Sequence, residues 1–291
     1  MLTSELQRQI RQIRLKARHL VDGPFAGDYL SIFKGRGTEF SEVREYEAGD
    51  DVRSIDWKVT ARLGTPYVKR YIEERELTVM LLADVSASTE FSTHQRQKRQ
   101  IIAELSTVLG LNAIRHNNRV GLLMFSDRIE AYVAPAKGRV QTTRILAALF
   151  SAQARQVGTN ISLALETLAK RVPQRTMCFV ISDFHDPGYE KAMRSLRKRH
   201  ALIPVCISDA AEEQWPDIGL ATLRDLETGE QVMIDSSDAS FQSAYRARHQ
   251  DLQAARRQVF KRLSLGSIDI ETSQSFVGPV KRYFRRRAIG R

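Results

Sequence analysis

The sequence contains little cysteine and no long hydrophobic segment. Its two cysteines, Cys178 and Cys206, both lie inside apolar runs, a position that predicts small buried thiols and no disulfide framework. No apolar run approaches the roughly 20 residues that a membrane-spanning helix needs. The amino-terminal segment also lacks the apolar centre of a signal peptide. We therefore expect a cytoplasmic protein without a membrane span.

The chain is also short of acidic residues. Its 45 Lys and Arg residues against 34 Asp and Glu residues give a net charge of +11, which favours acidic partners such as proteins, nucleic acid or a membrane surface. Charge alone does not choose among these three. Hydrophobic residues make up 42% and charged residues 27% of the 291 positions. This composition is typical of a globular protein and excludes a fibrous or wholly disordered one.

The most informative segment is 77–88, which reads LTVMLLADVSAS. An apolar run of strand length ends there in Asp84, Ser86 and Ser88. A strand that is apolar on both faces belongs in the middle of a parallel sheet covered by helices. Three oxygen-bearing side chains just past its carboxyl end can converge on one point, and oxygen ligands suit a hard cation such as Mg²⁺. For any single one of these residues, helix capping or turn formation is the simpler interpretation.

Strands and helices alternate along the chain that follows. Apolar runs at 120–125, 176–181 and 201–207 predict buried strands, residues 129–133 predict an antiparallel edge strand, and helical patterns separate most of them. The alternation predicts an α/β fold with a doubly wound, mostly parallel sheet and ligands at the carboxyl ends of its strands. We assign residues 77–291 to this domain, with a hairpin insertion near 218–236 and a basic final helix.

Residues 1–76 form an amino-terminal extension in this interpretation. Residues 4–21 have the spacing of an amphipathic helix, which we expect to pack on the protein's own core because it lacks bulky aromatic residues for a membrane. Residues 35–76 indicate a small β-rich unit, in which Ile55 and Trp57 alternate with polar neighbours. Its interleaved basic and aromatic residues could stack on single-stranded nucleic acid. We favour the interpretation that the charged residues form an exposed strand face and that the aromatic side chains turn inward beneath it.

Two later segments extend the polar cluster after residue 83. Gly158-Thr159 precedes a predicted helix, and Ser182-Asp183 ends a predicted strand. Together with the DVSAS run at 84–88, they resemble the metal-ion-dependent adhesion site of von Willebrand factor type A domains. The resemblance implies a von Willebrand factor A fold in which the strands ending at Asp84 and Asp183 are neighbours. It also implies a set of Mg²⁺ ligands, bound directly or through water: Asp84, Ser86, Ser88, Thr159 and Asp183.

The segment upstream narrows the resemblance further. The runs RGTEF at 36–40, REY at 44–46 and GDDVRSIDW at 49–57 resemble the signature of the bacterial "domain of unknown function fifty-eight" family. The resemblance implies a protein that works as an adaptor or chaperone-like partner of a MoxR-type AAA+ ATPase. In this role the open coordination position of the Mg²⁺ would take an acidic residue of a partner protein. No enzymatic activity follows from the resemblance, and we expect none.

Two alternatives remain from the residues themselves. The first is a Mg²⁺-dependent phosphohydrolase with Asp84 as nucleophile, although the position two residues on, where such chemistry needs a carboxylate, is Ser86. The second is nucleic-acid binding through the basic surface, in particular the run KRYFRRR at 281–287. His185 and Asp186 suggest a richer metal or acid/base site, but we favour a solvated loop. We expect most of the other histidines to be surface residues: His19, His94, His116, His200 and His249.

Overall fold

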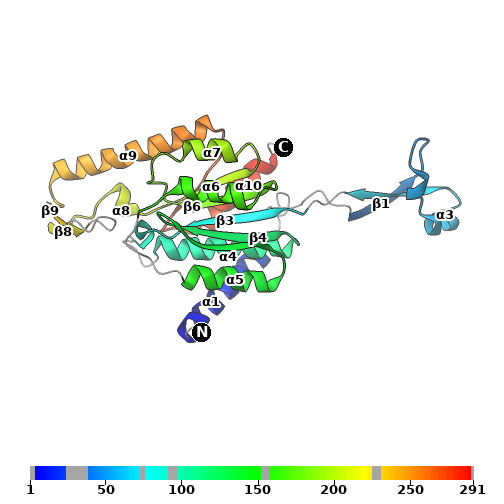
Figure 1. Ribbon diagram of the computed structural model, residues 1–291, viewed down its shortest axis with the longest axis horizontal. Coiled ribbons are helices and arrows are strands. Elements are labelled where there is room, and N and C mark those ends of the chain that lie inside the picture. Colours follow the sequence, from blue (N-terminus) through cyan, green and yellow to red (C-terminus); the bar gives the residue numbers. More distant parts are fainter. Residues whose placement is uncertain are drawn as a thin grey trace.

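The computed structural model describes residues 4–23, 39–72, 76–90, 97–151, 158–224 and 231–289. Residues 36–38 of the RGTEF run and His94 lie outside these ranges. Figure 1 shows an α/β body and, away from it, a smaller amino-terminal unit that carries β1 (Glu39–Glu45) and α3 (Trp57–Leu63). No helix in the described ranges is long and apolar enough to cross a membrane.

A six-stranded sheet forms the centre of the body. Its strand order is β10-β7-β6-β3-β4-β5. β5 is antiparallel to β4, and the other neighbours are parallel. The strands are β3 (Thr78–Asp84), β4 (Arg119–Phe125), β5 (Ile129–Ala136), β6 (Thr176–Ser182), β7 (Ala201–Ser208) and β10 (Ile268–Glu271). The doubly wound, mostly parallel sheet and its antiparallel edge strand confirm the predicted fold class.

Helices cover both faces of this sheet (Figure 1). One hydrophobic cluster contains side chains of α1, α4, α5 and α10, and the second contains side chains of α6, α7 and α9. The helices are α1 (Ser4–Asp22), α4 (Lys98–Arg115), α5 (Arg139–Ser151), α6 (Ile161–Arg171), α7 (Glu190–Leu196), α8 (Ala210–Glu213), α9 (Ala239–Arg262) and α10 (Val277–Ile289). A separate antiparallel pair, β8 (Leu220–Arg224) and β9 (Gln231–Asp235), precedes α9.

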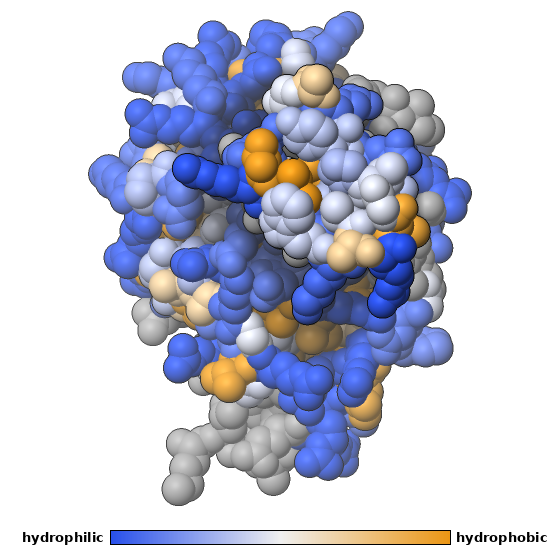
Figure 2. Space-filling view, turned by 90° about the vertical axis from the view of Figure 1, so that its right-hand side faces the viewer, coloured by the Kyte–Doolittle hydropathy of each residue, from blue (hydrophilic) through white to orange (hydrophobic). Residues whose placement is uncertain are grey.

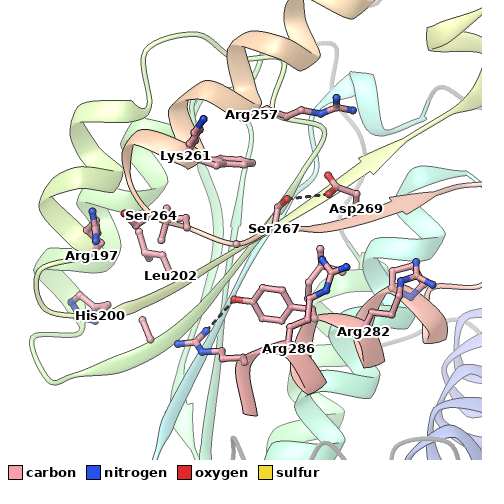
Figure 3. A pocket seen from close by; sticks show the side chains of 18 residues that line it. Arg197, His200, Leu202, Arg257, Lys261, Ser264, Ser267, Asp269, Arg282 and Arg286 are labelled. Atoms are coloured by element: carbon pink, nitrogen blue, oxygen red, sulfur yellow. Dashed lines mark hydrogen bonds between the residues drawn. The ribbon is translucent and has the colours of Figure 1, made fainter. Parts of the chain in front are cut away.

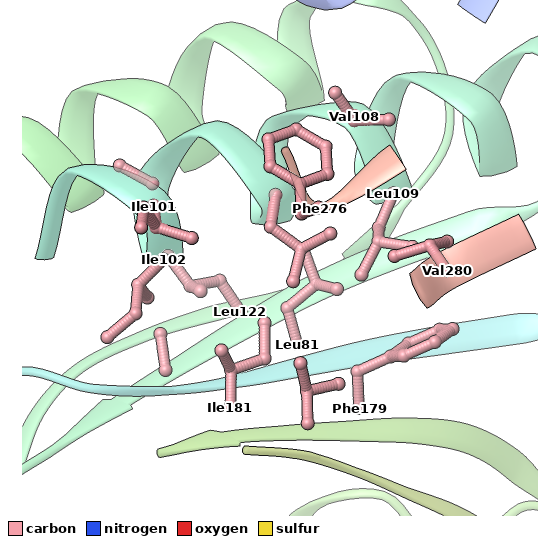
Figure 4. Close-up of a cluster of buried hydrophobic side chains, with 14 of the residues drawn as sticks. Leu81, Ile101, Ile102, Val108, Leu109, Leu122, Phe179, Ile181, Phe276 and Val280 are labelled. Atoms are coloured by element: carbon pink, nitrogen blue, oxygen red, sulfur yellow. The ribbon is translucent and has the colours of Figure 1, made fainter. Parts of the chain in front are cut away.

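The central strand β3 is buried along its whole length. Val79 and Leu81 point into the first cluster, whereas Met80 and Leu82 point into the second, because successive side chains of a strand face opposite sides of a sheet. Figure 4 shows Leu81 beneath side chains of α4 and α10. The near-continuous apolar run of β3 is therefore the consequence of helices on both faces.

The amino-terminal helix α1 packs on the body, as its pattern predicts. Ala17 and Val21 are buried in the first hydrophobic cluster. Lys16 pairs with Glu104 of α4 at 3.0 Å, and Arg115 of α4 donates to Asp22 at 2.5 Å. The apolar face of α1 is thus covered by the protein itself.

The amino-terminal unit contains less strand than the sequence predicts. β1 (Glu39–Glu45) and β2 (Tyr67–Ile72) pair antiparallel, but a 3₁₀ turn, η1 (Val52–Ser54), and the helix α3 (Trp57–Leu63) lie between them. The alternation around Ile55 and Trp57 predicted a strand, and this prediction is wrong. A helix begins there instead, because Asp56 caps α3 by accepting from Lys58 N at 3.0 Å. Trp57 is 67% exposed rather than turned inward.

Two aspartates stabilise the turn that precedes η1 and α3 by accepting hydrogen bonds. Asp50 accepts from the Arg44 guanidinium at 2.6 Å and from Glu47 N at 2.9 Å, and Asp51 accepts from Arg53 N at 2.9 Å. Gly49 supplies the positive φ of 114° that this turn requires. Gly49, Asp50 and Asp51 therefore have a structural role in shaping this turn.

Figure 2 views the molecule from the side of the amino-terminal unit and shows a mostly hydrophilic surface with a few hydrophobic areas.

Candidate metal site

Asp84 ends β3 with its side chain fully buried. Its Oδ1 accepts from the Ser86 backbone N at 2.9 Å and from Ser86 Oγ at 2.6 Å. Its Oδ2 accepts from Ser182 Oγ at 2.6 Å, across the β3–β6 strand pair. Both carboxylate oxygens are therefore fixed by hydroxyl or amide donors.

The two serines lie in the turn that follows β3. Val85 N donates to Phe125 O of β4 at 2.8 Å, and Thr89 donates through its backbone N and its hydroxyl to Ser86 O. The bond from Thr89 N begins the 3₁₀ turn η2 (Ala87–Glu90), and the bond from Val85 N ties the segment to β4. They place Ser86 Oγ and Ser88 Oγ 3.1 Å apart. The alternation of polar residues predicted such convergence.

Asp183 reaches the same place from the neighbouring strand β6. Its side chain is 1% exposed, accepts a hydrogen bond from His185 N at 3.3 Å and lies beside the Ser88 hydroxyl. The following residue, Phe184, has a φ of 60°. Because β3 and β6 pair in parallel, their carboxyl ends meet at the same edge of the sheet. The prediction that these two strands are neighbours is confirmed.

The two buried carboxylates influence each other's ionisation. Burial, with the negative charge of Asp183, raises the pKa of Asp84 to about 7. Burial also opposes ionisation of Asp183, but Lys98 and His185 outweigh it and hold the pKa of Asp183 below its usual range. Without a further cation the cluster therefore favours a proton on Asp84 and a negative charge on Asp183.

Lys98 is part of this cluster and was not expected from the sequence. Its side chain is 1% exposed, and its Nζ lies 3.2 Å from Asp183 Oδ2. The same ammonium pairs with Glu212, whose other oxygen accepts from Asp209 N at 3.0 Å in a capping box of α8. Burial lowers the pKa of Lys98, but the charges of Asp183 and Glu212 outweigh it and raise the pKa overall.

One sequence signal was available for Lys98. Lys98, Ile101, Ile102 and Leu105 follow the i, i+3, i+4, i+7 spacing of one helix face, and all four are buried. A lysine on the buried face of a helix needs a buried carboxylate as its partner. Glu212 gave no comparable signal, because its contact with Lys98 joins residues far apart in the chain.

Thr159 belongs to the segment that directly precedes α6. It is half-buried and precedes Asn160, whose backbone N donates to Ser126 O after β4 at 2.8 Å. Asn160 caps α6, and Asp186 accepts from Ile161 N at 2.7 Å. Among the described residues, no hydrogen bond joins Thr159 to the other four predicted ligands. Asp186 thus has a capping role at α6.

The histidines divide into exposed and buried ones. His185 has a 37% exposed side chain, with its Nδ1 3.8 Å from Asp183 Oδ2. His200 and His249 are 4% and 8% exposed, so the prediction of surface positions is wrong for these two. Burial, in each case the largest cause, lowers their pKa values. Asp183, His185 and Glu212 also offer ligand atoms within 4.8 Å of one another, but the Lys98 ammonium already pairs with both carboxylates.

The donors present fit a hard divalent cation. Ser86 donates its hydroxyl hydrogen to Asp84, and Ser88 Oγ lies 3.1 Å from Ser86 Oγ, so that each serine oxygen keeps a lone pair for a metal ion. The raised pKa of Asp84 reflects its burial and a second negative charge nearby, and a cation would offset both. All of the donors are oxygen atoms, as Mg²⁺ prefers.

The fold and these residues define an α/β protein with a polar cluster at the switch point of a doubly wound sheet. Residues 42–255 match the family described as "Protein of unknown function DUF58". The chain belongs to this family.

Similar proteins are found in mycobacteria. The uncharacterized proteins Mb1516 of Mycobacterium bovis and Rv1480 of Mycobacterium tuberculosis are each 33% identical over 229 residues, which cover 77% of this chain and 72% of each relative.

Solved structures are more distant. The protein BatB from Bacteroides thetaiotaomicron is 13% identical, with a TM-score of 0.46 over 74% of this chain and 100% of BatB. The SpRpn10 VWA domain is 15% identical, with a TM-score of 0.41 over 71% of this chain and 94% of that domain.

Proposed function

We propose that this protein is a Mg²⁺-dependent protein-interaction module that binds an acidic residue of a partner. The observation that carries the proposal is the pair of serine hydroxyls, Ser86 and Ser88, 3.1 Å apart beside the buried carboxylates of Asp84 and Asp183. Asp84, Ser86, Ser88, Thr159 and Asp183 would hold the ion.

The chemistry supplied by the ion is Lewis acidity at an open coordination position, which suits a carboxylate of the partner. The protein's own residues maintain that property. Ser86 and Ser88 are neutral, so they hold a cation without cancelling its charge. Ser182 and the Ser86 amide fix the Asp84 carboxylate, and Lys98 partly neutralises Asp183. An ion held by these side chains would therefore retain affinity for another anion.

A MoxR-type AAA+ ATPase is the partner we propose, with this protein as its adaptor or chaperone-like companion. The family resemblance of the GDDVRSIDW run supports this choice. The net charge of +11 would speed the encounter with an acidic surface, in a manner that weakens with salt.

The hydrogen bonding of Asp84 supports a binding role over catalysis. A nucleophilic carboxylate needs an oxygen that can approach the substrate. Asp84 is fully buried, and both of its oxygens accept hydrogen bonds from serine donors. These contacts favour the interaction module over the phosphohydrolase.

The experiment is a direct binding measurement with the purified MoxR-type ATPase encoded in the same genome. Immobilised wild-type protein is compared with Asp84→Asn and with Asp217→Asn, an exposed aspartate that serves as the matched control. We expect binding in Mg²⁺ to the wild type and to the control, and loss of binding in chelator or in Asp84→Asn. Equal binding of all three proteins in chelator would overturn the proposal.

A further inference from the structure

A second candidate binding surface lies at the other side of the molecule from Asp84. A cavity of about 910 Å³ opens beside β10, the last strand of the sheet, near the amino-terminal ends of β7 and β10. Asp84, in contrast, lies at a carboxyl end. Figure 3 shows the cavity, with Arg257 and Lys261 of α9 on one side of Ser267 and Arg282 and Arg286 of α10 on the other.

The lining of this cavity is strongly basic. Six cationic side chains contribute to it: Arg197, Arg257, Lys261, Arg282, Arg286 and Arg287. Within the described ranges, none of the six forms an ion pair. Arg257 donates to Gln253 at 2.9 Å and Arg287 to the Tyr283 hydroxyl at 3.1 Å, and both acceptors are neutral. The acidic lining residue Asp269 accepts from Ser267 at 3.0 Å and lies 3.7 Å from Arg256. The cavity therefore has an excess of positive charge.

The first two residues of an edge strand, Ile268 and Asp269 of β10, line the same cavity. In the described sheet, β10 pairs on one side only, with β7. Ile268 and Ile270 point into the cluster that contains α10, whereas Asp269 lies on the face of Arg256 and α9. The basic side chains of α9 and α10 thus flank the outer edge of β10 from the two faces of the sheet.

A buried polar atom is also present in this lining. His200 is 4% exposed, and its Nδ1 has no hydrogen-bond partner within the described part of the chain. Burial lowers its pKa, which favours the neutral ring. A buried nitrogen without a partner is costly, and a bound group that offers an acceptor or donor would satisfy it.

We propose that this groove binds an extended acidic segment of a protein, which adds to the outer edge of β10 as a further strand. Successive side chains of an added strand point to opposite faces of a sheet. Consecutive acidic residues would therefore meet Arg257 and Lys261 on one face and Arg282 and Arg286 on the other. Backbone hydrogen bonds provide affinity in such complexes, and the flanking side chains provide specificity.

The arrangement favours a peptide over nucleic acid. Single-stranded nucleic acid is bound on aromatic side chains that stack with successive bases. Here Phe260 and Phe284 are buried and Tyr283 is half-buried with its hydroxyl bonded to Arg287. Cations on the two faces of a strand edge match the alternation of an extended peptide.

Fluorescence anisotropy with a labelled ten-residue peptide that carries Glu at consecutive central positions, and therefore on both faces of an added strand, tests the proposal. Its analogue with every backbone amide N-methylated keeps the charge but has no N–H donor on either edge for pairing as a strand. A labelled single-stranded DNA of ten nucleotides serves as a polyanion without a peptide backbone. We expect the unmodified peptide to bind at least about tenfold more tightly than the N-methylated peptide or the DNA. Equal binding of the N-methylated peptide, or tighter binding of the DNA, would overturn the proposal.

Charge reversals locate the binding to the groove. We expect Arg257→Glu/Lys261→Glu and Arg282→Glu/Arg286→Glu each to weaken peptide binding by about tenfold or more. The control variant Arg139→Glu/Arg144→Glu makes the same change of charge at two exposed positions of α5. Its affinity for the peptide should stay within about twofold of that of the wild type. Equal losses in all three variants would contradict the placement. Asp84→Asn should not alter this binding, so its outcome is independent of the proposed metal site.

Discussion

Lys98 Nζ lies 3.2 Å from Asp183 Oδ2, and each of the two side chains is only 1% exposed. The same ammonium pairs with Glu212. A buried charge is tolerated when it is paired, so the three residues depend on one another. The ion triad connects the end of β6 to the first turn of α4 and to α8.

Removal of the cation alone should be strongly destabilising. Lys98→Met keeps most of the side-chain volume but leaves Asp183 and Glu212 without their ammonium, a change expected to cost about 3–5 kcal/mol of unfolding free energy. Lys16→Met, which breaks the ion pair of a 56% exposed lysine with Glu104, should cost at most about 1 kcal/mol. Urea denaturation in the presence of chelator measures the free energy of unfolding of both variants and of the wild type.

A second variant separates charge from packing. Adding Glu212→Gln to Lys98→Met removes one of the two uncompensated carboxylates and should recover part of the lost stability. If Lys98→Met alone unfolds within about 1 kcal/mol of the wild type, the triad does not contribute as described.

Binding of Mg²⁺ should depend on pH through Asp84. Burial and the charge of Asp183 raise its pKa from 3.8 to about 7, so below that value the carboxyl holds a proton that must leave when a cation binds. Affinity should therefore rise from pH 6 to pH 8. Calorimetry in buffers of different ionisation enthalpy should detect release of about one proton at pH 6 and much less at pH 8.

The pH dependence of the Asp84→Asn variant provides the control. Its residual binding should lack the change between pH 6 and pH 8. A wild-type affinity that is flat over this range, with no proton release, would show that Asp84 does not exchange a proton for the cation.

The packing of β4 against β3 and β5 permits a separate test of the fold. A Cβ added at Gly121 would lie 2.4 Å from Met80 Sδ and 2.9 Å from Val133 O. Gly121→Ala should therefore destabilise the protein by about 1–3 kcal/mol. At Gly110, in α4, the nearest atom would be 3.7 Å away, so Gly110→Ala should instead stabilise by about 0.5–1 kcal/mol. Thermal unfolding that shows the same sign for both would contradict the described packing.

The sequence predicted the sheet and most of its helices because burial leaves a clear pattern. The two-sided apolar run of β3 and the spacing of α1 follow directly from what covers them. Local hydrogen bonding was harder to anticipate. Asp56 starts α3 where alternation predicted a strand, since a single capping side chain can override a weak period-two pattern.

The site was predicted in part for a related reason. Asp84, Ser86 and Ser88 are close in sequence, and the topology of parallel strands brings Asp183 to them. Lys98 and Glu212 meet only through tertiary packing of α4 and α8, which periodicity does not specify. The buried position of His200 likewise depends on how α7 ends against β7.

The most direct test of the metal site is calorimetric titration of the purified protein with Mg²⁺ at pH 8. Wild type is compared with Ser86→Ala/Ser88→Ala and with Ser195→Ala/Ser243→Ala, two exposed helical serines as the matched control. The proposed site predicts one Mg²⁺ per chain for the wild type and the control, and an affinity at least about tenfold lower for Ser86→Ala/Ser88→Ala. Equal affinity in all three proteins, or no binding by the wild type at millimolar Mg²⁺, would contradict it.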